Sequence, residues 1–574
     1  MDLVYFIILV SVLVFVHELG HFAVAKAFGV KVLTFSLGFG PKIVRVRGKE
    51  TEYCIGLLPL GGFVKMLEKT DSAEPILPED EKRTFESQAA WKRVLIVLAG
   101  PAMNVLFPVV LYTSVYFEDR ELLPPTVGVV LPGHPADGKL LPGDLITAVD
   151  GEEVNTFTAV QHLVSKRAGT SVKFRVERDG KTVEVPITPT DDVEVQELDI
   201  VEHTGRIGIL PSFPAPVIGV PRTDSPAYRA GLRTFDRITA INGRKVERYV
   251  DLVDALAQNR GDALVLAFLR PVAAPDAAGG LIDIAVLEPQ VATLTPLPRG
   301  GDAKAELDSA ARAGDVFTRT GIESSDLYVA FVPSGSSEWK AGLRAGDRIT
   351  SLDGAPMLKW HSIEEDLVRE ASRRRKLEWT RDGEPMGGSF ELRREQWNDE
   401  FGQHYERYVF RTTHFAPNAP DKLVPNDRRL RYSLSRGFAE TGRAIEFVAV
   451  GFLRLLQGRV SLAAVSGPIT LYDVAGRAGA KGTTYFVWAM ALVSINLGVI
   501  NLLPIPVLAG GHLAFLFVEA VRKKPLTRRT REIASLIGMS MLVLLMLIAF
   551  KNDVSRHWSD IAGSVHDMFS RGHS

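Results

Sequence analysis

Four long apolar stretches constrain this chain more than any other feature of its sequence. They run from Leu3 to about Phe28, from Val94 to Phe117, from Tyr485 to about Leu508, and from Ile533 to Phe550. A run of about 18 or more apolar residues is long enough to cross the hydrocarbon core of a bilayer as a helix. The 574-residue chain is therefore predicted to be a polytopic α-helical membrane protein with four transmembrane helices.

The charges of the connecting loops predict an orientation for these spans. Lysine and arginine are frequent between residues 29 and 93 and again between residues 522 and 531. Both loops are expected to be cytoplasmic, because cytoplasmic loops carry an excess of basic residues. Residues 118–430 and both termini would then lie outside the cytoplasm. The net charge of -1 gives no electrostatic reason to expect a nucleic-acid partner, and a single cysteine, Cys54, excludes an internal disulfide framework.

The first stretch has a second interpretation, a cleaved signal peptide with AVA at residues 23–25 as its cleavage site. Two features speak against it. Asp2 occupies the place of the expected basic start, and HELGH at residues 17–21 interrupts the apolar run before that site. A membrane span is the better prediction.

An internal repeat occurs three times between the second and third spans. Its copies read LLPGDLITAVDGEEV (140–154), GLRTFDRITAINGRKV (231–246) and GLRAGDRITSLDGAPM (342–357). In each copy an Asp stands seven residues before a Gly, and the alternating apolar strand between them ends in Asp-Gly or Asn-Gly. Such a dipeptide predicts a hairpin turn. The region is thus expected to contain three copies of one module.

These copies resemble PDZ domains of the bacterial protease-associated type. SPAYRAGL (225–232) and SSEWKAGL (336–343) carry the fuller pattern, and HPADGKLL (134–141) is a looser match. The resemblance implies three PDZ-like α+β domains that bind peptide ends by adding them as a strand. For any single copy, a spacer that only controls access is the alternative.

The predicted organisation follows from these features. It comprises an N-terminal membrane half (1–117), PDZ-like domains at 125–190, 206–297 and 320–396, a linker at 298–319, an amphipathic juxtamembrane region at 430–480, and a C-terminal membrane half (481–574). The juxtamembrane helices are expected to lie at the membrane surface.

The first span contains the pentapeptide HELGH, which fits the H-E-x-x-H pattern. His17 and His21 are four residues apart, so they share one face of a helix and could hold one zinc ion. Glu18 is then placed to take a proton from zinc-bound water and pass it to a leaving amine. An interfacial histidine pair at a helix end is the alternative, but ionisable residues at membrane depth are costly and favour a functional role.

Further motifs resemble the site-2 protease family of intramembrane zinc metalloproteases, of the bacterial regulator of sigma-E protease type. They are VHELGHF (16–22), GGFVKM (61–66), AGPAMNVLF (99–107), SGPITL (466–471) and SINLGVINLLPIPVL (494–508). The resemblance implies that Gly61, Gly62, Phe63 and Val64 belong to a β-hairpin that engages the substrate as a strand. It also implies that Asn496 and Asn501 contact the substrate. Three PDZ-like copies exceed the two expected for this type.

One position departs from the family pattern. The stretch NLLPIPVLAGGHL (501–513) resembles the family's LPIPxLDGGH element, whose Asp is the third zinc ligand, and here that position is Ala509. Catalytic zinc usually has three protein ligands and a water molecule, so the catalytic activity of this exact sequence is in doubt. His512 could replace the ligand only if the Gly510-Gly511 turn changed shape. Ala509 fits either a site-directed change in an active protease or a natural homologue that binds substrates without cutting them.

The resemblance implies a zinc endopeptidase of the bacterial inner membrane with periplasmic PDZ domains. Its substrates would be single-span membrane proteins whose outer part has been trimmed, such as an anti-sigma factor. The alternative is a non-catalytic PDZ scaffold in the lipid bilayer. A channel or transporter is a weaker interpretation, because no paired inverted repeat is visible in the sequence.

Overall fold

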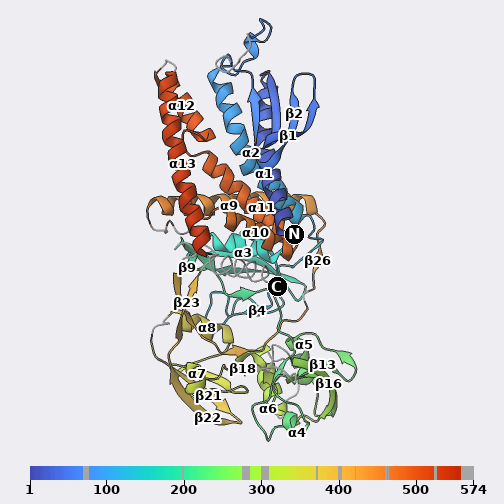
Figure 1. Cartoon of the computed structure of the whole chain (residues 1–574). Helices are drawn as coiled ribbons and strands as arrows, with labels where there is room; N and C mark the ends of the chain where they lie inside the picture. The colour runs from blue at the N-terminus through green and yellow to red at the C-terminus, as the bar shows by residue number, and fades with distance from the viewer. Residues whose placement is uncertain are drawn as a thin grey trace, which may run out of the picture. The chain divides into compact units, whose positions relative to one another are not determined.

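The structure is a computed structural model that describes residues 1–68, 76–196, 200–273, 285–298, 309–369, 373–398, 404–420, 422–458, 462, 465–522 and 526–556. The chain divides into two compact units (Figure 1). Unit 1 comprises Met1–Arg120, Asn398–His404 and Asn426–Ser574, and unit 2 comprises Glu121–Trp397 and Tyr405–Pro425.

Unit 1 is built mainly from helices with long apolar or amphipathic sequences. They are α1 (Asp2–Ala27), α2 (Ala90–Tyr116), α9 (Arg429–Leu456), α10 (Pro468–Lys481), α11 (Thr483–Asn501), α12 (Ala509–Arg522) and α13 (Arg528–Arg556). Helix α2 packs against α1, α9 and α11 (Figure 1). A core of buried apolar residues, among them Leu9, Leu13 and Met490, joins α1, α10 and α11.

Four of the described helices are long and apolar enough to cross a membrane, at Asp2–Ala27, Ala90–Tyr116, Thr483–Asn501 and Arg529–Ser555. The number of spans agrees with the sequence prediction, but the end of the third span was predicted wrongly. Helix α11 ends at Asn501 and not near Leu508. Pro504 and Pro506 lack a backbone N–H and disfavour helical geometry in the residue before them. The chain therefore turns over residues 502–508 and resumes as α12, a helix that the sequence analysis did not predict.

A folded sheet lies between α1 and α2 in the sequence. It is formed by β1 (Val32–Arg47) and β2 (Glu52–Met66), with a short η1 turn (Glu81–Arg83) after it. Residues 34–37 pair on one side with residues 62–65 and on the other with residues 52–55. Among the described strands, residues 62–65 have only this one pairing. They consequently form an edge strand whose outer backbone groups are available for a further strand.

Unit 2 contains three four-stranded sheets with one strand order. The orders are β6-β5-β7-β8, β14-β13-β15-β16 and β20-β19-β21-β22. The strands are β5 (Leu145–Val149), β6 (Glu152–Glu153), β7 (Val172–Arg178), β8 (Lys181–Ile187), β13 (Arg237–Ile241), β14 (Arg244–Lys245), β15 (Leu264–Ala273), β16 (Ala285–Leu294), β19 (Arg348–Leu352), β20 (Ala355–Pro356), β21 (Arg375–Arg381) and β22 (Glu384–Phe390). In each module a helix precedes the third strand in sequence: α3 (Phe157–Ser165), α5 (Tyr249–Gln258) or α8 (Trp360–Arg369).

Further elements between Glu121 and Pro425 lie outside these three sheets. They are β3 (Glu121–Leu122), β4 (Val129–Val130), β9 (Thr190–Gln196), β10 (Ile200–Arg206), β11 (Ile209–Leu210), β12 (Ile218–Gly219), α4 (Pro226–Arg229), α6 (Ser309–Thr320), β17 (Glu323–Ser324), η3 (Ser325–Leu327), β18 (Val329–Phe331), α7 (Ser337–Lys340), β23 (Arg393–Asn398), β24 (His404–Val409), β25 (Thr413–His414) and β26 (Val424–Pro425). Helix α6 occupies the C-terminal part of the predicted linker at 298–319, whose residues 299–308 lie outside the described part of the chain.

The Asp-Gly and Asn-Gly dipeptides of the repeat form hairpin turns, as the sequence predicts. The Asp or Asn has a φ of 48°, 48° or 51° at Asp150, Asn242 and Asp353, and the following Gly has a φ of 83°, 79° or 84°. Two successive residues with positive φ define the turn whose twist matches the flanking strands. Each turn joins two paired strands, β5 to β6, β13 to β14 and β19 to β20.

The other Asp of each repeat is fully buried and binds an Arg that lies 34 residues later in the chain. The pairs are Asp144 with Arg178, Asp236 with Arg270 and Asp347 with Arg381, all joined by two hydrogen bonds of 2.6–2.8 Å. The same Arg also donates to a backbone carbonyl, that of Lys139, Gly231 or Gly342. Two parallel bonds from one guanidinium are strong and geometrically specific, so this pair fixes the first strand to the third strand in every module.

Candidate functional site

Helix α1 brings the two histidines of HELGH together. His17 and His21 lie one turn apart and half-buried, and their Nε2 atoms are 3.3 Å apart. Two imidazole nitrogens that bind one tetrahedral zinc ion at about 2.0–2.1 Å are themselves about 3.3–3.4 Å apart. The pair therefore already has the separation that two zinc ligands require.

The hydrogen bond on the far side of the His21 ring sets its tautomer. Nδ1 of His21 lies 2.8 Å from the carbonyl oxygen of Ile96 in α2. A carbonyl only accepts, so Nδ1 carries the proton and Nε2 presents its lone pair. Metal-binding histidines commonly use their second ring nitrogen in this way.

Asn104 in α2 contacts Nδ1 of His17, just as the Ile96 carbonyl contacts Nδ1 of His21. The residue is completely buried, and its Nδ2 lies 3.1 Å from Nδ1 of His17. Its Oδ1 is buried and has no hydrogen-bond partner among the described residues. Turning the amide by about 180° exchanges the two atoms, so that Oδ1 accepts a hydrogen bond from Nδ1–H. Nε2 of His17 is then free for a metal. The unsatisfied oxygen is thus an observation that fits a metal on this histidine pair.

Glycines allow α2 to approach α1 this closely. A Cβ atom on Gly100 would lie 2.2 Å from Nε2 of His21, and one on Gly20 would lie 2.4 Å from the carbonyl oxygen of Ala99. Real Cβ atoms do not approach other atoms so closely, because packed interiors leave no room for the overlap. Gly100, in the AGPAMN motif, therefore makes room for the His21 ring.

A third ligand is missing from the described residues. No group of three or more His, Cys, Asp or Glu side chains that could hold a metal occurs among them. Ala509, the first residue of α12, offers only a methyl group, and α12 packs against α2. His512 follows in the same helix and is exposed. The two histidines fit zinc, and the part of the chain that the structure describes supplies no further protein ligand beside them.

Glu18 lies beside the edge strand of the folded sheet. A Cβ atom on Gly62 would be 3.1 Å from Cγ of Glu18 and 2.8 Å from a methyl group of Val14. Gly61 has a φ of 110°, a conformation that glycine adopts without strain. Phe63 and Val64 continue the strand and pair with Ser36 and Phe35. The GGFV segment and the glutamate of HELGH are thus neighbours.

The two asparagines predicted to contact a substrate lie on α11. Asn496 is exposed, and Asn501 is half-buried at the last residue of the helix. The face of α11 toward α2 is formed by other residues. Ser494 donates a hydrogen bond of 2.7 Å to the carbonyl oxygen of Asn104, and a Cβ atom on Gly498 would meet Val105 and Asn104.

Sequence reasoning recognised the AGPAMN motif but gave no role to its residues. The structure places Asn104 against His17 and Gly100 against His21. A buried asparagine in the middle of a membrane span is a costly residue, and that cost was the signal that could have identified Asn104. No sequence signal identifies the Ile96 carbonyl, because any residue can supply a backbone acceptor.

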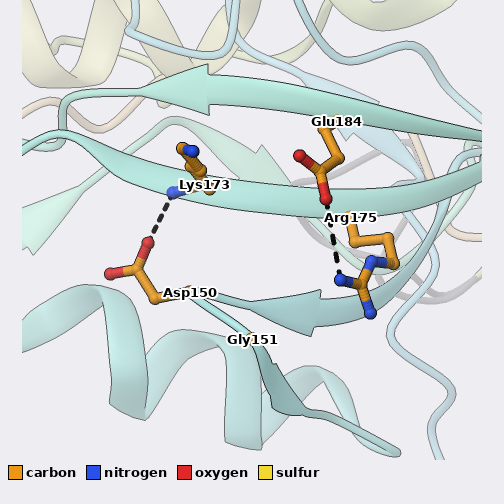
Figure 2. A pocket seen from close by; sticks show the side chains of 5 residues that line it. All are labelled: Asp150, Gly151, Lys173, Arg175 and Glu184. Atoms are coloured by element: carbon orange, nitrogen blue, oxygen red, sulfur yellow. Dashed lines mark hydrogen bonds and ion pairs between the residues drawn. The ribbon is translucent and has the colours of Figure 1, made fainter.

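A cavity of about 370 Å³ lies in the first module of unit 2 (Figure 2). Its lining residues are Asp150, Gly151, Lys173, Arg175 and Glu184. Figure 2 shows that the Asp150 carboxylate accepts a hydrogen bond from the Lys173 backbone, at 2.7 Å, and that Arg175 pairs with Glu184 across two strands. These contacts secure the hairpin turn and the sheet, so the polar lining is explained by the fold of the module.

Comparison with known proteins gives matches along almost the whole chain. The profile of peptidase family M50 matches residues 5–545. The regulator of sigma-E protease RseP of Escherichia coli is 29% identical over 560 residues, 97% of this chain and 98% of the relative. A putative zinc metalloprotease of Neisseria meningitidis is 28% identical over 562 residues, with 96% and 98% covered. A crystal structure of a PDZ domain of an SdrC-like protein from Listeria innocua is 27% identical over 15% of this chain and 91% of its own, with a TM-score of 0.13.

Proposed function

The chain belongs to peptidase family M50, the site-2 protease family, and from this premise we propose that α1, α2 and α12 form the centre of an intramembrane zinc endopeptidase. In this chain, Ala509 occupies the position of the third ligand. The observation that carries the proposal is the 3.3 Å separation of the His17 and His21 Nε2 atoms inside a candidate membrane span. The unpartnered Oδ1 of Asn104 beside His17 supports it.

Each residue of the centre has a distinct role in this proposal. Zinc, when bound, would supply a water whose pKa is lowered to about 7 and would polarise the scissile carbonyl. His17 and His21 would hold the metal through Nε2, while Asn104 and the Ile96 carbonyl fix their rings. Glu18 takes the proton from the attacking water and delivers it to the leaving amine, the role of a general base that becomes a general acid.

Replacing Ala509 by Asp is expected to strengthen zinc binding by at least about a hundredfold, because even the loss of a partner outside the first ligand shell costs about 10–100-fold. Competitive titration of the purified protein with zinc and a chromophoric chelator measures the change. Ala509→Asn is the matched control, since its neutral amide has the size of Asp but is a poor zinc ligand. Equal affinities for all three chains would contradict the assignment of position 509.

The edge strand at residues 62–65 is the proposed substrate site. Helical amides are hydrogen-bonded within the helix, so a substrate helix has to open before a peptide bond becomes accessible. An opened segment could pair with the outer backbone groups of Gly62, Phe63 and Val64, as peptides add to exposed sheet edges elsewhere. Asn496 and Asn501 are proposed to hydrogen-bond the opened substrate backbone. The closeness of Gly62 to Glu18 supports cleavage next to this strand.

Gly62→Ala tests the strand. The added Cβ would lie 2.8 Å from the Ser36 carbonyl oxygen and 3.1 Å from Glu18, which pushes the strand away from the centre. In the Ala509→Asp background we expect cleavage to fall by about tenfold or more, since displacements near 1 Å can cost about 100-fold, with zinc affinity unchanged. Gly442→Ala, where a Cβ meets nothing within 4 Å, is the control. Full cleavage by Gly62→Ala would remove the strand from the mechanism.

Substrate, partners and location are also proposals. The name of the Escherichia coli relative, a regulator of sigma-E protease, supports a single-span, anti-sigma factor-like substrate. We propose a multi-pass protein of the bacterial inner membrane whose basic loops are cytoplasmic and whose three modules are periplasmic. The modules would act as PDZ domains that bind peptide ends or exclude substrates with large outer parts. Charged-reagent labelling of cysteines placed in a module and in the loop at residues 48–50, in intact cells, tests the orientation.

A second candidate function is a PDZ scaffold without catalysis. It is favoured by Ala509 and by the lack of a complete metal-binding cluster among the described residues. The two functions differ in which residues matter. In an Ala509→Asp chain the protease requires Glu18, whereas a scaffold tolerates Glu18→Gln and fails when a module is unfolded.

A further inference from the structure

The C-terminal end of α13 carries a completely buried carboxylate, that of Asp553. It accepts hydrogen bonds from the backbone N–H groups of Gly467, Ile469 and Thr470, at 2.9, 2.8 and 3.1 Å, and from the Thr470 hydroxyl at 2.6 Å. The neighbouring Asn552 donates to the carbonyl oxygens of Leu462 and Val465. A segment more than 80 residues earlier in the chain is thus tied to the fourth span.

The contact with Asp553 caps the N-terminus of α10. The first N–H groups of a helix have no partner within the helix, and Gly467, at the N-cap, has no side chain to satisfy them. Asp553 takes that role from another helix, with its negative charge at the positive end of the helix dipole. Bonds to an ionised acceptor are about twice as strong as neutral ones. A Cβ atom on Gly467 would lie 2.8 Å from the carboxylate, so the glycine is also needed.

Helix α10 is in turn packed tightly on the helix that carries HELGH. A Cβ atom on Gly476 would lie 2.8 Å from the Asp2 side chain, and one on Gly479 would lie 2.4 Å from the Tyr5 ring. Such close approach of backbone to side chain leaves little freedom for sliding. The position of α10 is therefore fixed relative to the beginning of α1.

The fourth span also contacts the turn that leads to α12. A Cβ atom on Gly538, in α13, would lie 3.0–3.2 Å from atoms of Pro506. Three residues later, at Ala509, α12 begins. Of the described helices and strands, α13 packs most extensively on α10. The contact at Asp553 therefore belongs to the most extensive interface of α13, and the Pro506 turn rests on the same helix.

We propose that Asp553 is a positioning residue for the metal centre. By clamping α13 to α10, and through α10 to α1, it sets where the turn at residues 502–508 presents residue 509 relative to His17 and His21. The role in metal binding rests on the proposed function, whereas the role in placing α13 does not. A merely structural carboxylate would stabilise the protein without altering the geometry of the centre.

The first test measures the distance between α1 and α13 in the chain that keeps Ala509. Spin labels on cysteines at Ile8 in α1 and Leu536 in α13, both exposed, report the separation of the two helices in a Cys54→Ser background. We expect one narrow distance distribution, broadened or shifted by Asp553→Ala and to a lesser extent by Thr470→Val, which removes a single hydrogen bond. Asp473→Ala is the control, because Asp473 lies on α10 and pairs with Arg477 at the surface. An unchanged distribution in Asp553→Ala would overturn the proposal.

The second test measures zinc affinity in the Ala509→Asp chain. Asp553→Ala should weaken binding by about 10–100-fold, the cost typical of a lost partner behind a metal ligand, and Asp473→Ala should leave it unchanged. An altered distance with unaltered zinc affinity would reduce Asp553 to a structural role and overturn the proposal. If Ala509→Asp itself fails to strengthen zinc binding, the proposed function is contradicted, and the distance measurement still decides whether Asp553 positions α13.

Discussion

Glu18→Gln in the Ala509→Asp chain is expected to reduce cleavage of a single-span substrate by about 100- to 10,000-fold, the range by which a positioned general base accelerates a reaction. Glutamine has nearly the same shape but cannot accept the proton of the attacking water. The Glu18 side chain lies beside the edge strand at Gly62. It takes no part in the two hydrogen bonds that orient the rings of His17 and His21. Zinc affinity should therefore stay the same. Initial rates on a purified reporter in detergent, together with zinc titrations, measure both quantities.

The matched control for this prediction is Glu446→Gln, at an exposed position of α9, which should cleave like its parent. Retained cleavage in Glu18→Gln would show that another group handles the proton. Simultaneous loss of zinc and cleavage would instead make Glu18 a residue that supports the metal.

Asp347→Ala is expected to destabilise the third module by about 3 kcal/mol. Removing one partner of a buried ion pair costs about 3–5 kcal/mol, and the lower end applies because the Arg381 side chain is 35% exposed and can reach water. The backbone N–H of Arg344 also loses its acceptor. Hydrogen exchange should quicken in the strand Arg375–Arg381. The equivalent strand Val172–Arg178 of the first module should keep its protection, which provides an internal control.

A double variant separates the ion pair from the fold of the module. Asp347→Leu with Arg381→Met replaces both partners by apolar groups, a change that is often nearly neutral, and should recover much of the lost protection. Unchanged protection of Arg375–Arg381 in the single variant would mean that the pair does not hold the two strands together.

The parts of the fold that sequence reasoning found are those that a local pattern encodes. The apolar runs predicted all four candidate spans, and the Asp-Gly and Asn-Gly dipeptides predicted the hairpin turns. The third span was extended too far because hydropathy continues through Leu508 while Pro504 and Pro506 end the helix. The arginines that pair with the buried aspartates were missed, since two strands and a helix intervene between the two partners.

In the candidate site, too, only the residues that belong to a local pattern were predicted. The helical spacing within HELGH is enough to identify the two histidines, and in the structure their Nε2 atoms are 3.3 Å apart. The partners of those rings come from α2, 75 and 87 residues away, and their positions depend on packing at Gly20 and Gly100. Asp553 was not singled out, because three of its four hydrogen bonds come from backbone groups of a distant segment that almost any sequence could supply. Contacts that join distant backbone atoms leave no pattern in one sequence.

We propose that this chain is a site-2 type protease in which only the ligand at position 509 is lacking. The most direct test is cleavage of a single-span reporter by the purified chain, by Ala509→Asp and by Ala509→Asn, at a buffered free zinc concentration that fills the site of Ala509→Asp but not that of the other two. We expect cleavage by Ala509→Asp, and rates at least about a hundredfold lower for the other two, in line with the expected difference in zinc affinity. Equal rates of cleavage by the unmodified chain and Ala509→Asp would contradict the role given to position 509. No cleavage by any of the three on several reporters would contradict the protease and favour the scaffold.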